Sequence, residues 1–236
     1  TLMHTYDRNY FKIALPAALE GLFMILLAST DLIMVGALGA LSIAAVSIFM
    51  QPRLILLCFS RSLASSVTLL VSKKAGAGDT IGTADIMKKS LTLCAIFMGL
   101  LHILFYIFLD DIFYLMGAND EYMAEAMAYG PIALAAVYVT SLTLILQAVQ
   151  LGYGRTSVIM KTNVCGNVVN LALNALLIFG LGPIPSLGVT GAAIGTLVST
   201  IFTLTWTAWI LKNESFFSGG SYLPDRAYFH RIMPIL

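Results

Sequence analysis

The stretch that decides the fold runs from Thr162 to Leu211 and reads TNVCGNVVNLALNALLIFGLGPIPSLGVTGAAIGTLVSTIFTLTWTAWIL. It contains no charged residue, and it is too long for one membrane crossing, which needs about 20 apolar residues. Residues that favour turns interrupt its middle: Gly180, Gly182, Pro183, Pro185 and Gly188. The stretch therefore predicts two membrane-spanning helices joined by a short turn.

The composition of the whole chain also favours a membrane protein. Its 236 residues are 59% hydrophobic and 11% charged, whereas soluble domains carry about 25% charged residues. The 13 Lys and Arg nearly balance the 12 Asp and Glu, so no basic field exists to hold phosphates. These features exclude a soluble globular protein, a disordered chain and a nucleic-acid binder.

Outward from the opening stretch, the chain contains six apolar runs long enough to span a bilayer. They are Phe11 to Val35, Ile43 to Val71, Ser90 to Leu109, Ala126 to Gln150, Thr162 to Phe179 and Val189 to Leu211. The second run is the weakest, because Arg53 and Arg61 interrupt it. The pattern predicts an all-α integral membrane protein with a bundle of six transmembrane helices.

The positions of Lys and Arg predict the orientation of these helices, since cytoplasmic flanks hold the excess of both residues. All the basic residues outside the second run fall on one side of the six predicted spans: Arg8, Lys12, Lys73, Lys74, Lys88, Lys89, Arg155, Lys161, Lys212, Arg226 and Arg231. We therefore expect a multi-pass protein of the cell's inner (plasma) membrane, with both ends of the chain in the cytoplasm.

A short motif near the start of the chain returns near its end. The segment from Asp7 to Pro16 reads DRNYFKIALP, and the segment from Asp225 to Pro234 reads DRAYFHRIMP. Chance, or the shared chemistry of a membrane interface, is one explanation. We favour an internal repeat, with residues 1–218 as a six-helix lobe and residues 219–236 as a linker and the start of a second lobe, as in transporters built from parallel repeats.

Four charged side chains lie within the predicted spans: Glu20, Asp31, Arg53 and Arg61. Facing lipid, each would cost roughly 2.5 to 3.5 kcal/mol, so they must pair, reach the surface or line a water-filled cavity. Glu20 and Arg53 are expected at similar depth, which favours a salt bridge between them. Arg61 is nearer the cytoplasmic end and is expected to extend to the membrane surface.

Asp31 is the best candidate for a functional site, because Arg53 is the only basic side chain expected near its depth in the membrane. A carboxylate in a poorly hydrated place can hold a proton or an alkali cation. Asn170 and Asn174 belong to a polar stripe in the fifth run, with spacings of three and four residues, and Thr196 follows in the sixth. Together these four residues offer the oxygen ligands that hard cations prefer.

The alternative for the asparagine stripe is hydrogen bonding between helices, which joins membrane helices at roughly 0.6 kcal/mol per contact. Gln147 in the fourth run is a further candidate for the cavity lining, together with Glu20 and Arg53. Gly191 and Gly195 form a G-x-x-x-G step, which is more typical of close helix packing than of function. No catalytic or phosphate-binding motif is present, so we do not expect an enzyme.

Several motifs together resemble the multidrug and toxic compound extrusion (MATE) family of cation-coupled efflux transporters. They are Pro16, Asp31 to Gly36 with Leu38-Gly39, Ala44 to Val46, Gly76 to Asp79, Gly154-Arg155, the pair Asn170 and Asn174, Leu177 to Gly180, and Leu187 to Thr196. The resemblance extends over the whole chain. Glu20, Arg53 and Arg61 do not match the pattern of the family.

The resemblance implies one lobe of a twelve-helix, two-lobe transporter with a central cavity that opens alternately to each side. Its implied partners are amphipathic, often cationic drugs, membrane lipids and the second lobe of the same chain. No cofactor is implied beyond Na+ or H+ as coupling ion. Asp31 matches the essential carboxylate of the family, and Asn170, Asn174 and Thr196 match its amino-terminal cation site.

Some members of this family carry aspartate where Asn174 stands, which leaves the choice between Na+ and H+ open. Two alternatives to an exporter also stay open at this point. One is a lipid-linked oligosaccharide flippase of the same superfamily, for which Arg53 and Arg61 would suit a basic cavity. The other is a membrane scaffold without transport activity.

Overall fold

The computed structural model describes residues 15, 18–19, 21–22, 25–26, 29–180, 185–214 and 219–235, and all regular structure in them is helical. Residues 29–36 are helical, and eight further helices follow: α2 (Ala40–Ile48), α3 (Met50–Gly76), α4 (Thr80–Ile107), α5 (Leu109–Leu115), α6 (Asp120–Gly152), α7 (Thr156–Phe179), α8 (Gly188–Lys212) and α9 (Arg226–Ile232). The prediction of an all-α bundle is confirmed.

Within the described part of the chain, five segments are long and apolar enough to cross a membrane: α2 with α3, then α4, α6, α7 and α8. Several large apolar side chains on α4 are more than half exposed, including Leu100 (64%) and Ile103 (58%). An exposed apolar face of this size suits lipid rather than water. Part of the first predicted span, including Pro16 and Glu20, lies outside the described residues.

The second predicted span is a helix in two parts, α2 and α3, with a turn at Phe49. Pro52 explains the break, because proline has no N–H to donate to the carbonyl of Ile48 one turn earlier, and it is tolerated in the first turn of α3. From there α3 continues through both Arg53 and Arg61 without interruption.

The third predicted span begins earlier than the apolar run suggested. α4 starts at Thr80 rather than at Ser90, and the Asp79 carboxylate caps it by accepting from the Gly82 N–H at 2.7 Å. The polar first part of α4 includes Lys89, which forms ion pairs instead of facing lipid. The helix can therefore begin before the apolar run.

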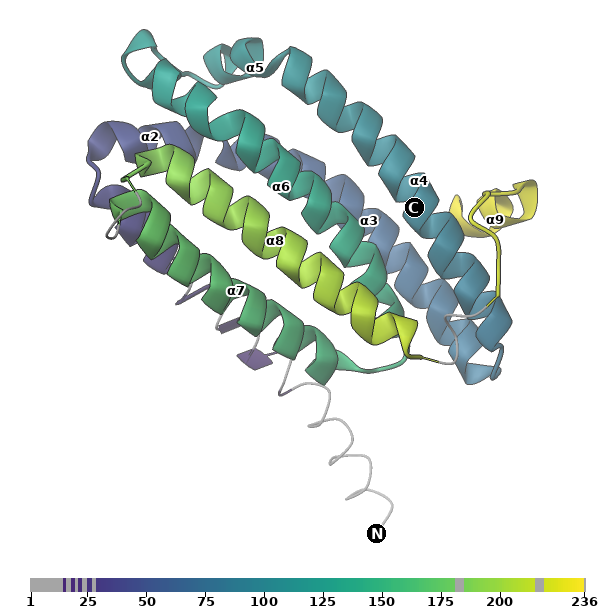
Figure 1. Ribbon diagram of the computed structural model, residues 1–236. Coiled ribbons are helices and arrows are strands. Elements are labelled where there is room, and N and C mark those ends of the chain that lie inside the picture. Colours follow the sequence, from purple (N-terminus) through teal and green to yellow (C-terminus); the bar gives the residue numbers. More distant parts are fainter. Residues whose placement is uncertain are drawn as a thin grey trace.

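The long helices lie side by side in one slanted bundle (Figure 1). α8 packs most extensively against α6 and α7, while α6 also packs against α3 and α4. The main apolar core lies among α3, α4 and α6 and includes Leu56, Val67, Met98 and Ile145, all buried. α6 is therefore the central helix, and α7 with α8 forms a layer to one side of it.

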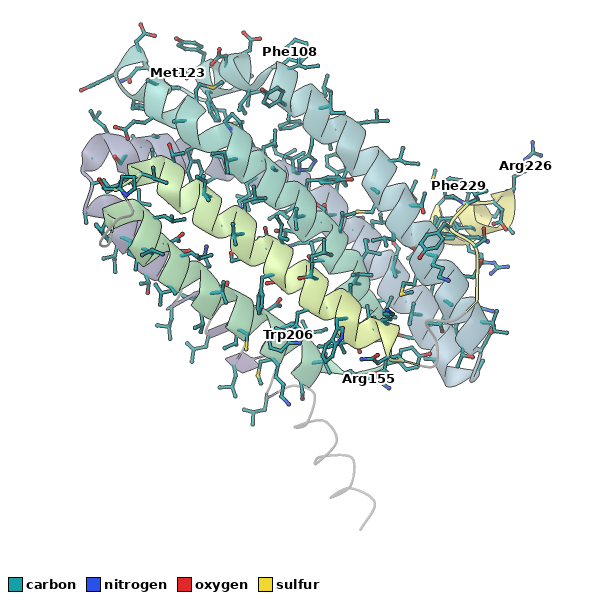
Figure 2. All side chains as sticks on the ribbon, viewed as in Figure 1. Phe108, Met123, Arg155, Trp206, Arg226 and Phe229 are labelled. Atoms are coloured by element: carbon teal, nitrogen blue, oxygen red, sulfur yellow. The ribbon has the colours of Figure 1, made fainter. Side chains whose placement is uncertain are left out.

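The two ends of the bundle differ in their side chains. Figure 2 shows Phe108 and Met123 near one end, and Arg155 and Trp206 near the other. Lys74, Arg155 and Lys212 lie at or near helix termini of the second end, which we call the basic end.

The small helix α9 is attached to α4 by polar contacts near the basic end. Lys89 Nζ lies 2.7 Å from Asp85 Oδ2 and 2.9 Å from Asp225 Oδ2, and the Lys89 side chain is only 7% exposed. The hydroxyls of Ser90 and Tyr228 are 2.8 Å apart. We call these contacts the α4–α9 clamp.

Asp225 also caps α9, since its Oδ1 accepts from the Tyr228 N–H at 2.8 Å. The hydrogen bond from Lys89, together with that from Tyr228, holds the pKa of the Asp225 carboxyl below its ordinary value. α9 thus begins beside the residue at which the sequence repeat predicts a second lobe. The division of the chain into lobes stays a prediction.

Candidate functional site

The site is built on the close approach of α7 and α8. A Cβ atom at Gly191 would overlap the backbone carbonyl of Leu177, and one at Gly195 would overlap the side chain of Asn174. Only glycine lets the two helices approach this closely, as the G-x-x-x-G interpretation predicted. The polar faces of α7 and α8 are therefore held against each other.

At this contact the four residues of the predicted cation site form one hydrogen-bonded network. Asn174 Nδ2 donates to Asp31 Oδ1 at 3.0 Å and to Asn170 Oδ1 at 3.3 Å. Asn170 Nδ2 donates to Thr196 Oγ1 at 3.3 Å. Asp31 is half-buried, while Asn170 and Asn174 are 7% and 2% exposed. The structure thus brings together residues from three separate helices.

The amide of Asn170 satisfies more partners when its oxygen and nitrogen exchange places. The nitrogen then donates to Asp31 Oδ1 at 3.3 Å and to Oδ2 at 3.1 Å, and the oxygen accepts from the Thr196 N–H at 3.2 Å. In that arrangement two amides, from Asn170 and Asn174, donate to one carboxylate. It gives the half-buried carboxylate a second donor, whereas the first arrangement leaves the Asn170 oxygen beside Asn174 as a further ligand for a cation.

The same residues line a cavity of about 310 Å³. Its polar wall comes from α7 and α8 and includes Asn163, Asn167, Asn170, Asn174, Thr196, Ser199, Thr200 and Thr203. Its arginine wall comes from α3 and carries Arg53 and Arg61. Apolar side chains complete the lining, among them Phe49, Leu57, Val137 and Leu144.

Arg53 lies in the cavity lining. Within the described residues, however, neither arginine forms an ion pair within 4.0 Å. The predicted partner of Arg53, Glu20, lies outside the described residues, so their salt bridge stays a prediction. Arg61 lines the cavity, a position that the expected extension to the membrane surface did not include.

Gln147 on α6, the further candidate from the sequence, also lies in the cavity lining. Its Nε2 donates to Asn163 Oδ1 at 2.7 Å, and Gln147 is 8% exposed. This bond is a contact between α6 and α7 of the kind that the helix-joining interpretation of the asparagine stripe expects. Asn163 of the asparagine stripe therefore both joins α7 to α6 and lines the cavity.

The predicted site included neither Ser199, Thr200 and Thr203 of α8 nor Tyr129 of α6. The structure places Tyr129 with Ser199, Thr200 and Thr203 in the cavity lining. The helical spacing of the hydroxyls could have indicated one shared face. For Tyr129 the sequence contains no comparable signal, because it belongs to no run of hydroxyl or amide residues at helical spacing.

The network offers a set of oxygen atoms for a cation. Asp31 supplies a carboxylate, Asn170 an amide oxygen and Thr196 a hydroxyl, and hard cations prefer such ligands. The Asn174 Oδ1 atom is buried and has no hydrogen-bond partner among the described residues, so this amide keeps a spare acceptor. The residues present therefore fit a small cation or a proton held at the carboxylate.

Comparison with known proteins gives a family match and several relatives. The family model described as MatE matches residues 16–176. The chain is 28% identical over 193 residues to the probable multidrug resistance protein NorM of Rhizobium meliloti, covering 82% of this chain and 41% of that protein. It is also 28% identical over 187 residues to the FAD transporter of Shewanella oneidensis, covering 77% of this chain and 40% of that protein.

Among solved structures, the fold is similar to that of a multidrug resistance MATE family transporter of the MOP superfamily in an outward-facing conformation. The TM-score is 0.85 at 25% identity, over 95% of this chain and 50% of that chain. This chain spans less than half the length of the two curated relatives and about half the length of the solved transporter.

Proposed function

Because the chain belongs to the MatE family, we propose that it forms the amino-terminal lobe of a cation-coupled exporter of amphipathic, drug-like compounds. The observation that carries this proposal is the Asp31 carboxylate, which lies in a cavity wall and accepts a hydrogen bond from Asn174. Asp31 is the one acidic residue among the described lining residues. It is therefore the natural group to hold a coupling cation.

In the proposed mechanism, Na+ or H+ binds at Asp31 and its movement into the cell drives export of the substrate. Asn170, Asn174 and Thr196 position the carboxylate and supply further oxygen ligands. A charge at this depth would cost roughly 2.5 to 3.5 kcal/mol if it faced lipid. Binding and release of a cation change the charge of the cavity and can thereby shift the equilibrium between its two conformational states.

The remaining parts of the proposal concern the whole transporter. The second lobe of the same chain would close the cavity and allow it to open alternately to each side. The basic end would face the cytoplasm, since Lys and Arg concentrate there, in the inner membrane. The two curated relatives have names that refer to different compounds, multidrug resistance in one and FAD in the other. Resemblance to the family adds the expectation that drug substrates are often cationic.

The test uses the full-length gene product in lipid vesicles with an imposed Na+ or H+ gradient. Asp31→Asn keeps the shape of the side chain but removes its charge, so ion-driven export of rhodamine 123 should fall about tenfold or more. Comparing the two gradients in the wild type identifies the coupling ion.

The matched control is Asp111→Asn, which removes the same charge from an exposed position on α5, outside the cavity. It should export the dye at the wild-type rate. Unchanged ion-driven export by Asp31→Asn, with normal amounts of folded protein, would show that Asp31 is not the coupling group.

A further inference from the structure

The arginine wall has no role in the mechanism proposed above. Arg53 and Arg61 lie eight residues apart on the continuous helix α3, which corresponds to about two turns and about 12 Å along its axis. Both are exposed on the cavity, and neither forms an ion pair within 4.0 Å with the described residues. By contrast, Lys74 and Lys89 are both paired with aspartates.

The charge of the described lining is positive. It contains two arginines and one aspartate, Asp31, and Asp31 is already engaged by the amide of Asn174. An arginine held in a membrane protein without a counter-ion is costly. A ligand that brings a negative charge would remove this cost, whereas a cationic ligand would add to it everywhere except beside Asp31.

The geometry suits one class of ligand. Guanidinium groups bind carboxylate, sulfonate and phosphate groups through paired N–H donors. Between and beside the arginines, the apolar residues Met50, Leu57 and Leu144 offer a surface for an apolar body. The volume of about 310 Å³ is at the lower end of the range for small-molecule sites, which is about 300 to 1,000 Å³.

We infer that the arginine wall binds the anionic group of an amphipathic substrate, so that anionic amphiphiles belong to the cargo of this cavity. The inference rests on the proposed transport function and names a substrate class for it. In this arrangement the cation occupies the Asp31 network on the polar wall, and the substrate occupies α3 and the apolar lining. The two ligands then bind different walls of one cavity.

The experiment measures dye binding to the purified full-length protein by fluorescence anisotropy. Fluorescein and rhodamine 123 share a xanthene ring system but carry opposite charges, so they separate charge from shape. The wild type should bind fluorescein more tightly. The double substitution Arg53→Gln with Arg61→Gln should weaken fluorescein binding about tenfold or more and leave rhodamine 123 binding unchanged or tighter.

Three further variants separate the effect of charge from that of folding. Lys73→Gln removes one positive charge from an exposed position on the same helix, outside the cavity, and should leave both affinities unchanged. The double substitution Arg53→Lys with Arg61→Lys keeps the charge, so it should keep the preference for fluorescein. Asp31→Asn should tighten fluorescein binding, because it removes a negative charge from the cavity.

Tighter binding of rhodamine 123 than of fluorescein by the wild type would overturn the inference, as would equal weakening of both dyes in the double glutamine variant. The outcome is independent of the coupling test. If Asp31→Asn leaves ion-driven export intact, the proposed coupling role fails, while the preference for an anionic dye still stands or falls on the binding data.

Discussion

The cavity and the basic end contain the same kinds of charged side chain, but their surroundings differ. At the basic end several charges are paired with one another: Lys74 with Asp79, Lys89 with Asp85 and Asp225, and Arg155 with Glu214. In the cavity, Asp31, Arg53 and Arg61 form no ion pair within 4.0 Å with any residue that the structure describes.

This difference separates charges that hold the fold from charges that can meet a ligand. The pairs of the basic end fix loops and α9 to the helices. The cavity is organised instead by close backbone packing of α7 on α8 and by neutral amides around Asp31. Substitutions in the two regions should therefore affect stability in different ways.

The largest effect on stability is expected at Gly191. In Gly191→Ala the new methyl group would overlap the backbone of Leu177 and Ile178, and a backbone cannot move aside as a flexible side chain can. The helices must separate, at a cost of about 3 kcal/mol, and the contact between Asp31 and Asn174 should loosen with them. Thermal unfolding in detergent measures the loss.

Gly76→Ala is the matched control, because a Cβ at Gly76 would meet nothing within 4 Å. Its unfolding temperature should equal or slightly exceed that of the wild type, because alanine favours the helix and lowers the entropy of the unfolded chain. If the two alanine variants prove equally stable, close packing of α7 on α8 is not what organises the cavity.

A smaller effect is expected when the α4–α9 clamp is broken. Lys89→Met removes the shared partner of Asp85 and Asp225. The lysine is buried, but the aspartates are partly exposed, so the loss should be about 1 to 2 kcal/mol. Arg53→Gln removes a cavity charge that has no such pair among the described residues, so it should leave stability unchanged or raise it. Equal losses in the two variants would remove the distinction between the regions.

Much of the fold could be predicted from the sequence, because length and hydropathy identify a membrane helix without knowledge of its neighbours. The errors fall where a local contact decides the boundary. α4 begins ten residues earlier than predicted because the cap at Asp79 and the ion pairs of Lys89 permit a polar first part. The break before α3 follows from Pro52, a signal that was present in the sequence but was not used.

The candidate site was harder to predict from the sequence. Spacing placed Asn170 and Asn174 on one helical face, but no periodicity shows which faces of different helices meet. The grouping of Asn174 with Asp31, 143 positions apart, came from the ligand preferences of hard cations and from resemblance to a family, not from periodicity. The position of Arg61 in the cavity depends on how α3 is rotated against α6, which is a property of packing.

The smallest expected effect is the response of the α4–α9 clamp to acid. Hydrogen bonds from Lys89 and from the Tyr228 N–H lower the pKa of Asp225 in the folded protein, below the ordinary aspartate value of about 3.9. The charged carboxylate therefore stabilises the clamp above about pH 4, and this contribution disappears as the pH falls through the lower value of the folded state.

Hydrogen exchange of the α9 amides, corrected for intrinsic rates, should show reduced protection below about pH 4 in the wild type. Asp225→Asn cannot form the charged contact, so its α9 should exchange faster at neutral pH and respond less to acid. Asp111→Asn, which alters no contact of the clamp, should behave as the wild type does. Protection of α9 that is insensitive to acid in the wild type would mean that apolar burial of Tyr228 and Ile232, which are 3% and 0% exposed, holds the helix without the ion pair.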